Sequence, residues 1–243
     1  MSENLTWAYG ITTMPERGET FLKQSRESLA RTGFNDPRFF VDDHHVGRSL
    51  LVESVMLSTC TVTRNPTIGP MGNWWLALWE LFIRSPHADR YAIFQDDILA
   101  CSNLREYLER WYPENGYLNL ISFPENLQGI QPEDPRGWRK APRRGKGGQG
   151  LVFDQNAIAA LFSQLRMVRK FQELKNPNKR LDGAVREAME NAGITEWIHN
   201  PSLLYHLGAM GKTSIANNKK KQPLITSFPG EDFNLLDIER SEL

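Results

Sequence analysis

The sequence predicts an α/β fold, in which helices flank a mixed and mostly parallel sheet. Short apolar runs with strand character alternate in the first half of the chain with segments whose apolar residues recur at helical spacing. Strands that alternate with helices are joined by right-handed crossovers and form a mostly parallel sheet. Two expected strands end in Asp-Asp, at 42–43 and 96–97, which puts carboxylates at the edge where open sheets of this kind bind ligands.

The first half of the chain supplies most of the expected elements. We expect strands at residues 5–13, 37–43, 59–65, 91–97 and 117–123. We expect helices at residues 18–34, 69–85 and 103–112. Gly33 is a stop signal for the first helix, because glycine is favoured just past a helix end.

The second half has fewer periodic segments. Residues 124–150 are rich in Pro and Gly and are expected to form a long loop. Residues 151–165 are expected to form a strand followed by a helix, and another helix is expected to begin near residue 181. Residues 195–208 are expected to form a short strand, a turn and a further extended piece.

The length and composition are those of one globular unit. The chain has 243 residues, of which 40% are hydrophobic, enough for one sizeable core. We expect a single domain over 1–216, with halves at 1–123 and 124–216, followed by a polar C-terminal tail over 217–243.

The charge balance, the cysteines and the apolar runs bear on the location and the partners of the protein. The 29 basic and 29 acidic residues balance, so the whole-chain charge indicates no partner. Cys60 and Cys101 are expected to be reduced core residues. The first residues lack a signal-peptide pattern, and no apolar run is long enough to span a membrane. We therefore expect a cytoplasmic protein, or one in the host cytoplasm for a viral source, with no membrane partner.

The two Asp-Asp pairs are candidates for ligand or metal binding. Asp42 and Asp43 are expected to share the rim of a ligand crevice with Asp96 and Asp97. Because adjacent residues of a strand point to opposite faces, Asp97 is the candidate ligand for Mg²⁺ or Mn²⁺, and Asp96 would orient a sugar hydroxyl or ribose. The alternative is that both pairs cap the helices that follow them.

Six short motifs carry a resemblance to a known group. "GITTMPER", "FVDD" and "FQDD" occur in this order, and "GGQGLVF", "RLDGAVREAM" and "PSLLYHLG" follow downstream. Together they resemble nucleotide-sugar-dependent glycosyltransferases of the GT-A fold, a Rossmann-like architecture, including family 2 and phage enzymes that modify DNA. The resemblance covers roughly residues 6–214. Many members have Asp-x-Asp where this chain has Gln95 at the first position.

The resemblance implies a role for each matching residue. The half 1–123 would bind the nucleotide, and the half 124–216 would hold the acceptor and the catalytic group. The donor would be a nucleotide diphosphate sugar, with UDP-sugar as the expected choice. Asp97 and His206 would hold Mn²⁺ or Mg²⁺. The residues that would bind the nucleotide-sugar are Thr12, Thr13, Pro15, Arg17, Asp42, Asp43, Asn73, Gln95, Asp96, Gly148, Gln149, Gly150 and Lys212.

Asp182 matches the place where inverting members keep a catalytic base at the start of a helix. An ionised Asp there would take the proton of the acceptor hydroxyl as it attacks the anomeric carbon. The alternative is an ordinary helix N-cap, which Asp also favours. Asp154 and Glu187 are weaker candidates for the base.

The segment 136–146 is basic and contains no acidic residue. It suggests an anionic acceptor, such as a hydroxymethylated base in DNA, beside the alternative of a glycan. The weak acceptor-binding candidates are Trp138, Arg139, Arg143 and Arg144. The segment also leaves open a nucleic-acid or polyanion-binding module in which Trp138 stacks on bases. A metal-assisted phosphohydrolase that uses the same carboxylates is the third hypothesis.

Overall fold

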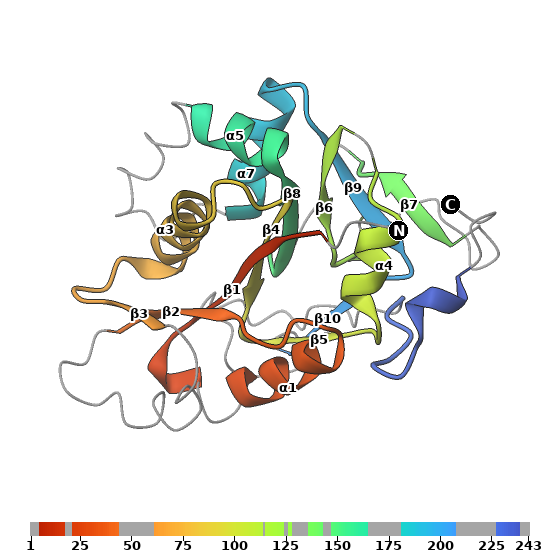
Figure 1. The fold of residues 1–243 in the computed structure, drawn as a ribbon, viewed down its shortest axis with the longest axis horizontal. Helices are drawn as coiled ribbons and strands as arrows, with labels where there is room; N and C mark the ends of the chain where they lie inside the picture. The colour runs from red at the N-terminus through yellow and green to blue at the C-terminus, as the bar shows by residue number, and fades with distance from the viewer. Residues whose placement is uncertain are drawn as a thin grey trace.

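The centre of the protein is an eight-stranded sheet with the order β3-β2-β1-β4-β8-β6-β9-β7 (Figure 1). Its strands are β1 (Trp7–Thr13), β2 (Arg38–Asp42), β3 (Thr61–Arg64), β4 (Arg90–Gln95), β6 (Gly116–Asn119), β7 (Gly137–Lys140), β8 (Gly150–Asp154) and β9 (Thr195–Asn200). The computed structural model describes residues 5–17, 21–43, 61–113, 115–123, 126–127, 136–142, 147–164, 181–207 and 227–238.

The sheet is mixed and mostly parallel, as predicted. β1 lies between β2 and β4 and runs parallel to both, β3 extends this set beyond β2, and β6 is parallel to β9. β8 runs antiparallel to both β4 and β6, and β7 runs antiparallel to β9. All strands except β7 and β8 therefore point in one direction.

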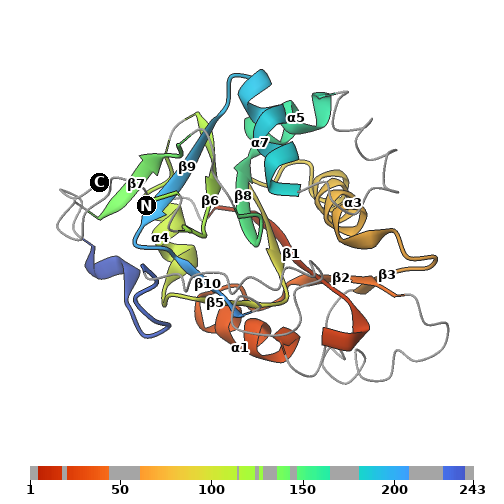
Figure 2. The same ribbon diagram turned by 180° about the vertical axis from the view of Figure 1, so that it is seen from behind.

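Helices cover both faces of the sheet (Figures 1 and 2). The helices α3 (Gly69–Arg84), α5 (Gln155–Ser163) and α7 (Leu181–Asn191) share one hydrophobic core with the sheet. The helices α1 (Lys23–Arg31) and α4 (Leu104–Arg110) share the other. Successive residues of β4 alternate between the two cores: Tyr91 and Ile93 face α3, whereas Ala92 and Phe94 face α1. This alternation follows from the two-residue period of a strand.

Two short strands were not expected from the sequence. β5 (Ile98–Ala100) pairs with β10 (Leu204–His206) in a separate antiparallel ribbon. The strand β7 lies within residues 124–150, where only a loop was expected. Both strands are too short to show a hydrophobic period in the sequence.

The C-terminal segment corrects a second expectation. Residues 227–238 fall within the expected polar tail, yet they pack against the core through Leu235 and Ile238, which are both buried. The short 3₁₀ helix η4 (Leu235–Asp237) lies against α4, and Asn234 forms a bridge with Ser102. The reason is that a few apolar side chains in a mostly polar stretch suffice to anchor it.

Other expectations stand as follows. Gly33 follows α1 with a φ of +97°, the left-handed conformation of a helix stop. Cys101 is a buried free cysteine, and Cys60 lies outside the described residues. Among the described helices, none combines the length and the apolar character needed to cross a membrane.

The strand directions bring several chain segments to one rim. The carboxyl ends of β1, β2 and β4 lie side by side, so Asp43 and Asp97 are at the same edge of the sheet, as predicted. Because β8 is antiparallel, its first residue, Gly150, pairs with Phe94 at the end of β4. The chain that enters β8 therefore reaches the same rim.

Candidate active site

A pocket with a volume of about 100 Å³ lies at the carboxyl ends of β1, β2 and β4. The residues that line it are Thr12, Thr13, Met14, Arg17, Asp42, Pro70, Asn73, Gln95 and Asp96. Seven of these were predicted to bind a nucleotide-sugar. Met14 and Pro70 were not, although Met14 follows Thr13 and Pro70 lies about one helical turn before Asn73.

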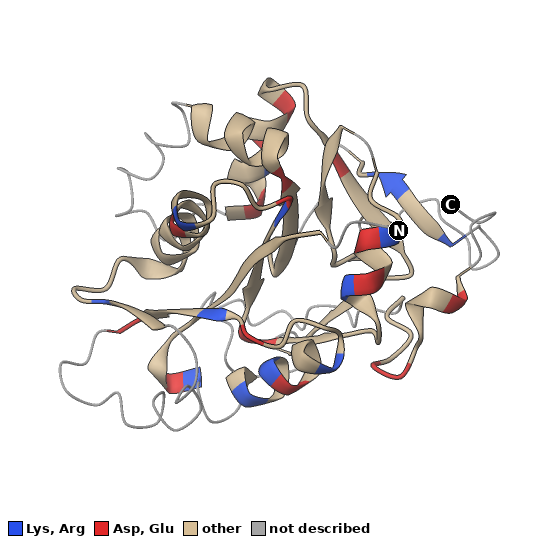
Figure 3. Ribbon diagram, in the orientation of Figure 1, with Lys and Arg blue, Asp and Glu red and all other residues tan. Residues whose placement is uncertain are grey.

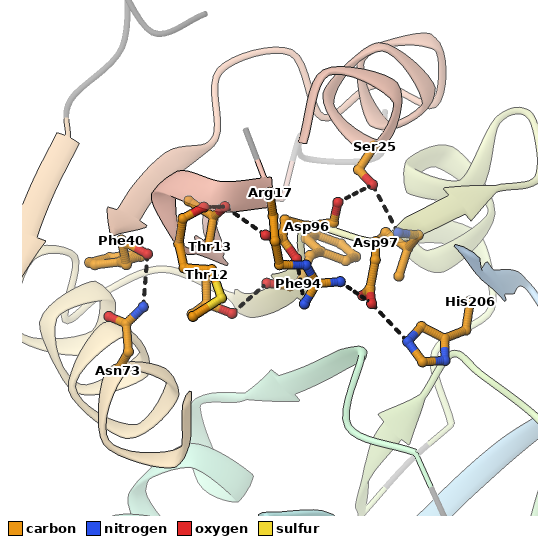
Figure 4. Close-up of polar contacts among 12 residues, drawn as sticks. Thr12, Thr13, Arg17, Ser25, Phe40, Asn73, Phe94, Asp96, Asp97 and His206 are labelled. Carbon is orange, nitrogen blue, oxygen red and sulfur yellow. Dashed lines mark hydrogen bonds and ion pairs between the residues drawn. The ribbon is translucent and has the colours of Figure 1, made fainter. Parts of the chain in front are cut away.

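The end of β1 is fastened to the end of β4. Thr12 Oγ1 donates a hydrogen bond to the Phe94 carbonyl at 3.2 Å, and Thr13 Oγ1 donates to Asp96 Oδ2 at 2.6 Å (Figure 4). These bonds fix the floor of the pocket. One oxygen of the Asp96 carboxylate therefore accepts a hydrogen bond from the Thr13 hydroxyl.

The other side of the pocket is formed by β2 and α3. Asp42 Oδ1 accepts a hydrogen bond from the backbone N–H of Ile68 at 2.9 Å, just before α3. This bond holds the residue before α3, although no described side chain caps the first turn of that helix. Asn73 is buried, and its Nδ2 donates to the Phe40 carbonyl at 2.8 Å, which ties α3 to β2.

The chain leaves the strand geometry at Asp96 and Asp97, which corrects the expectation that they face opposite ways. β4 ends at Gln95, so the strand alternation no longer applies to the two aspartates. Arg17, in the short 3₁₀ helix η1 (Pro15–Arg17), forms ion pairs with both carboxylates (Figure 4). Its Nη1 lies 3.2 Å from Asp96 Oδ1, and its Nη2 contacts Asp97 Oδ2.

His206 reaches the same carboxylate. The β5–β10 ribbon pairs His206 with Ile98, the residue after Asp97, and His206 Nε2 donates to Asp97 Oδ2 at 2.8 Å. The backbone N–H of Leu207 also donates to the Asp97 carbonyl at 2.8 Å. The two residues predicted to hold a metal are therefore in direct contact.

Burial affects the two aspartates differently. Desolvation raises the pKa of Asp96 to about 6, since Arg17 and the Thr13 hydroxyl offset it only in part. Burial also opposes ionisation of Asp97, but the interactions with His206 and Arg17 outweigh it, and the pKa of Asp97 lies below its usual value. Asp97 is therefore the more acidic of the two carboxyl groups.

The residues around Asp97 fit a divalent cation. A cation shared by the two side chains would take the place of the hydrogen bond between His206 Nε2 and Asp97 Oδ2. Asp97 Oδ1, which is buried without a hydrogen-bond partner among the described residues, would also be free to bind it. A carboxylate with an imidazole suits Mn²⁺ or Mg²⁺ when nucleotide oxygens and water complete the shell. In the described part of the chain no three His, Cys, Asp or Glu side chains cluster as a metal site. Asp97 and His206 would thus be the protein's contribution.

Asp182 lies beside the glycine-rich approach to β8. α7 begins at Leu181, so Asp182 is in the first turn of the helix rather than before it. Its Oδ2 accepts from the Gly147 N–H at 3.3 Å, and its Oδ1 accepts from the Gly183 N–H at 2.8 Å. Asp182 is half-buried and does not line the pocket.

The glycine-rich segment connects Asp182 to the end of β4. Gly148 is buried against the start of α7, where an added Cβ would lie 3.8 Å from that of Asp182. The Gln149 carbonyl accepts from the Gln95 N–H at 2.8 Å, and Gly150 pairs with Phe94. The predicted base and the pocket are therefore joined through one short stretch of backbone.

Sequence reasoning missed the polar residues beneath this stretch. Asn119 is fully buried, and its Nδ2 donates to the Gly147 carbonyl at 3.2 Å and to Glu196 Oε1 at 2.9 Å. Burial raises the pKa of Glu196, and Arg186 on α7 lies 3.9 Å from its Oε2. The signal was present, since Asn119 is a polar residue in the apolar run 117–123.

Several predicted residues lie elsewhere. Pro15 begins η1, and Asp43 is buried and does not line the pocket. Asp154 caps α5 and lies opposite Arg90 in the β4–β8 pairing, at the end of the strands away from the pocket. This position removes it as a candidate base. Glu187 lies on α7. Lys212, Arg143 and Arg144 are outside the described residues.

The basic segment corrects one expectation. Trp138 was expected as a stacking platform, but its ring packs inward, 6.3 Å from the Tyr107 ring and 5.0 Å from the His199 ring. The side chain is half-buried and packs against the core, because β7 pairs with β9 and turns this face toward α4. Arg139 is on the same strand, four places from β4 in the strand order. Figure 3 shows basic residues on β7.

Neither a scan against protein-family models nor a search of curated proteins found a match to this chain.

Proposed function

We propose that this protein is a GT-A-like glycosyltransferase that moves a sugar from a nucleotide diphosphate sugar, with UDP-sugar as the expected donor, to an acceptor hydroxyl. The proposal rests on the resemblance of the sequence motifs and on one structural observation. That observation is the pocket at the carboxyl ends of β1, β2 and β4, which gathers seven residues that the resemblance assigns to the donor.

The pocket has the chemistry that a nucleoside and its phosphates require. Asp42 and Asp96 offer carboxylate oxygens to the N–H and hydroxyl groups of a base and ribose. Arg17 borders the same space and can pair with phosphate oxygens through its planar fork. In open α/β sheets this edge is the usual place for a ligand.

In the proposed transfer step Asp182, which the resemblance matches to the catalytic base, acts on the acceptor. The acceptor oxygen forms a bond to the anomeric carbon while the bond from that carbon to the diphosphate breaks, and the electron pair leaves with the diphosphate. Asp182 accepts the acceptor hydroxyl's proton. Because the acceptor oxygen displaces the diphosphate in one step, the configuration of the anomeric carbon is inverted. Asp97 and His206 would hold the cation, which supplies charge neutralisation for the departing diphosphate when bound.

The test is a thermal-shift panel with UDP-, GDP- and dTDP-sugars, each with and without Mn²⁺. A ligand that binds the native state at about a hundred times its Kd stabilises it by roughly 2.7 kcal/mol, which raises the melting temperature. Asp42→Asn keeps an oxygen for the Ile68 N–H but removes the charge, and should weaken the shift. Asp36→Asn is the matched control, because Asp36 is exposed and does not line the pocket.

The outcomes separate the competing functions. A shift with one nucleotide-sugar that Asp42→Asn reduces and Asp36→Asn preserves supports the donor site. Cleavage of UDP-sugar to UMP and sugar phosphate would instead indicate the phosphohydrolase. Binding to duplex DNA with a steep salt dependence, without any nucleotide-sugar shift, would indicate the polyanion-binding module.

A further inference from the structure

Arg17 lies between two carboxylates at the rim. Its side chain is only 15% exposed, and it bridges the Asp96 and Asp97 carboxylates, which are 2% and 4% exposed. The guanidinium comes from η1 and the carboxylates from the end of β4, some 80 residues later in the chain. Two buried carboxylates so close together need a cation, because burial and their mutual repulsion oppose ionisation of both.

The contact of Arg17 with Asp97 coincides with a metal-binding position. Asp97 Oδ2 accepts from Arg17 Nη2 and from His206 Nε2 at once (Figure 4). A divalent cation held by Asp97 and His206 would lie at this junction. It would also lie close to the guanidinium, and two cations in a buried site repel one another strongly.

Arg17 can also direct its side chain to a ligand in the pocket. It lines the pocket as well as bridging the carboxylates, and its Nε is buried without a partner among the described residues. Its guanidinium carbon also lies 5.3 Å from the centre of the Phe21 ring, a cation–π contact. A diphosphate there would offer Arg17 the anionic oxygens that it gives up on Asp97.

We infer that Arg17 is an internal competitor of the divalent cation at Asp97, and that the nucleotide diphosphate resolves the competition by drawing Arg17 away. This inference rests on the proposed function and specifies the order that it imposes. Without nucleotide, Arg17 neutralises the carboxylates and the cation binds weakly. With a nucleoside diphosphate present, Arg17 pairs with the phosphates, and the cation and the nucleotide bind with positive coupling.

The test measures Mn²⁺ binding directly, by the electron paramagnetic resonance signal of free Mn²⁺, with and without UDP. Wild-type protein should bind Mn²⁺ weakly alone and about tenfold or more tightly with UDP, within the usual range of coupling between sites. Arg17→Met should bind Mn²⁺ without UDP at least about tenfold more tightly than wild type. Adding Asp97→Asn to Arg17→Met should abolish this gain.

Controls keep the result interpretable. Arg31→Met removes an arginine that pairs with Glu231, away from the pocket, and should bind Mn²⁺ as wild type does. Arg17→Lys retains the charge but lacks the fork that holds both carboxylates, so its Mn²⁺ affinity should fall between wild type and Arg17→Met. Arg17→Lys also provides the answer if Arg17→Met does not fold.

Each outcome is decisive for one proposal or the other. Equal Mn²⁺ affinity of wild type and both Arg17 variants would overturn the competition, even if UDP-sugars bind. Absence of Mn²⁺ binding in every protein would remove Asp97 and His206 as a cation site. Tighter Mn²⁺ binding in the Arg17 variants, with no effect of any nucleotide on it, would support the competition and overturn the role of the diphosphate in resolving it, while the thermal-shift panel decides the glycosyltransferase separately.

Discussion

The backbone N–H of Gly147 donates a hydrogen bond to the Asp182 carboxylate across 3.3 Å. This bond joins the start of α7 to the chain that enters β8. The Asp182 carboxylate is thereby held near the end of the sheet at which the pocket lies. Asp182 keeps both oxygens occupied by backbone N–H donors, from Gly147 and Gly183. A carboxylate held in this way is oriented before any substrate arrives.

Replacement of Asp182 by Asn should lower the turnover without lowering the stability of the fold. Asn keeps the size of the side chain and one accepting oxygen, but it cannot accept a proton. Turnover should therefore fall about 10²–10⁴-fold, while donor binding and the melting temperature change little. Asp154→Asn is the control, since Asp154 caps α5 at the opposite edge of the sheet. Normal turnover of Asp182→Asn with any acceptor would exclude Asp182 as the base.

Asn119 should be a positioning residue for this arrangement. In Asn119→Asp the side chain loses the two donors that serve the Gly147 carbonyl and Glu196, and it brings an acceptor to face both. The free energy of unfolding should drop by roughly 3 kcal/mol, the upper range for a buried unsatisfied group, and kcat should fall more than donor affinity.

A second change tests the cause of that loss. Glu196→Gln restores a donor, so the double variant Asn119→Asp/Glu196→Gln should recover part of the stability in urea unfolding. Asn191→Asp, at the exposed end of α7, is the matched control and should have little effect. No recovery in the double variant would contradict a direct hydrogen bond between the two side chains.

Asp97→Asn should affect both the fold and the ligand. Asp97 is buried and serves Arg17 and His206, so the neutral side chain leaves buried positive charge with less compensation. The free energy of unfolding should fall by about 3 kcal/mol, and Mn²⁺ should no longer strengthen nucleotide binding. Chemical unfolding and Mn²⁺-dependent thermal shifts measure the two effects. A variant as stable as the parent would show that this junction is not needed for the fold.

His199 should make the fold sensitive to acid. Burial lowers the pKa of His199 from 6.5 to about 4, and the neutral ring is held between the Tyr107 hydroxyl at 2.7 Å and the Pro201 carbonyl at 2.6 Å. The stability that this neutral ring contributes is complete above pH 6.5 and is lost as the pH falls toward 4, because the unfolded chain takes up the proton first.

The titration of Asp96 changes the stability with pH in the opposite direction to that of His199. Its raised pKa, about 6 against 3.8, gives a contribution that is complete below pH 3.8 and is lost as the pH rises through 6. The measurement is therefore the difference in unfolding free energy between wild type and His199→Gln, in which the Asp96 contribution cancels. This difference should grow by about 1.4 kcal/mol per pH unit between pH 4 and 6.5. A difference that does not change with pH would contradict a neutral buried His199.

The sequence predicted most of the fold because its apolar periods are local. β4 and α3 each repeat an apolar pattern over enough residues to be recognised, and β2 ends in a visible change from apolar to acidic residues. β5 is too short to carry such a pattern. β7 is equally short, and in addition its pairing with β9 is a long-range contact and two of its four residues are basic.

The site was predictable in its parts but not in its connections. The strand-end position of Asp42, Gln95 and Asp96 follows from local sequence, and all three line the pocket. The bridge from Arg17 to Asp97 joins residues 80 positions apart, and nothing near either residue specifies it. The exposure of Trp138 was misjudged because a charged neighbourhood says little about which way an aromatic ring in it points.

The outermost strands of the described sheet have a consequence for aggregation. An edge strand presents unpaired N–H and C=O groups on which another chain can add. Here β3 and β7 are each four residues long, β3 is followed within two residues by Pro66, and β7 carries Arg139 and Lys140. Short, interrupted and positively charged edges discourage strand addition between copies. Self-association at high concentration should therefore begin elsewhere, at the exposed Trp79 and Ile83 side chains of α3.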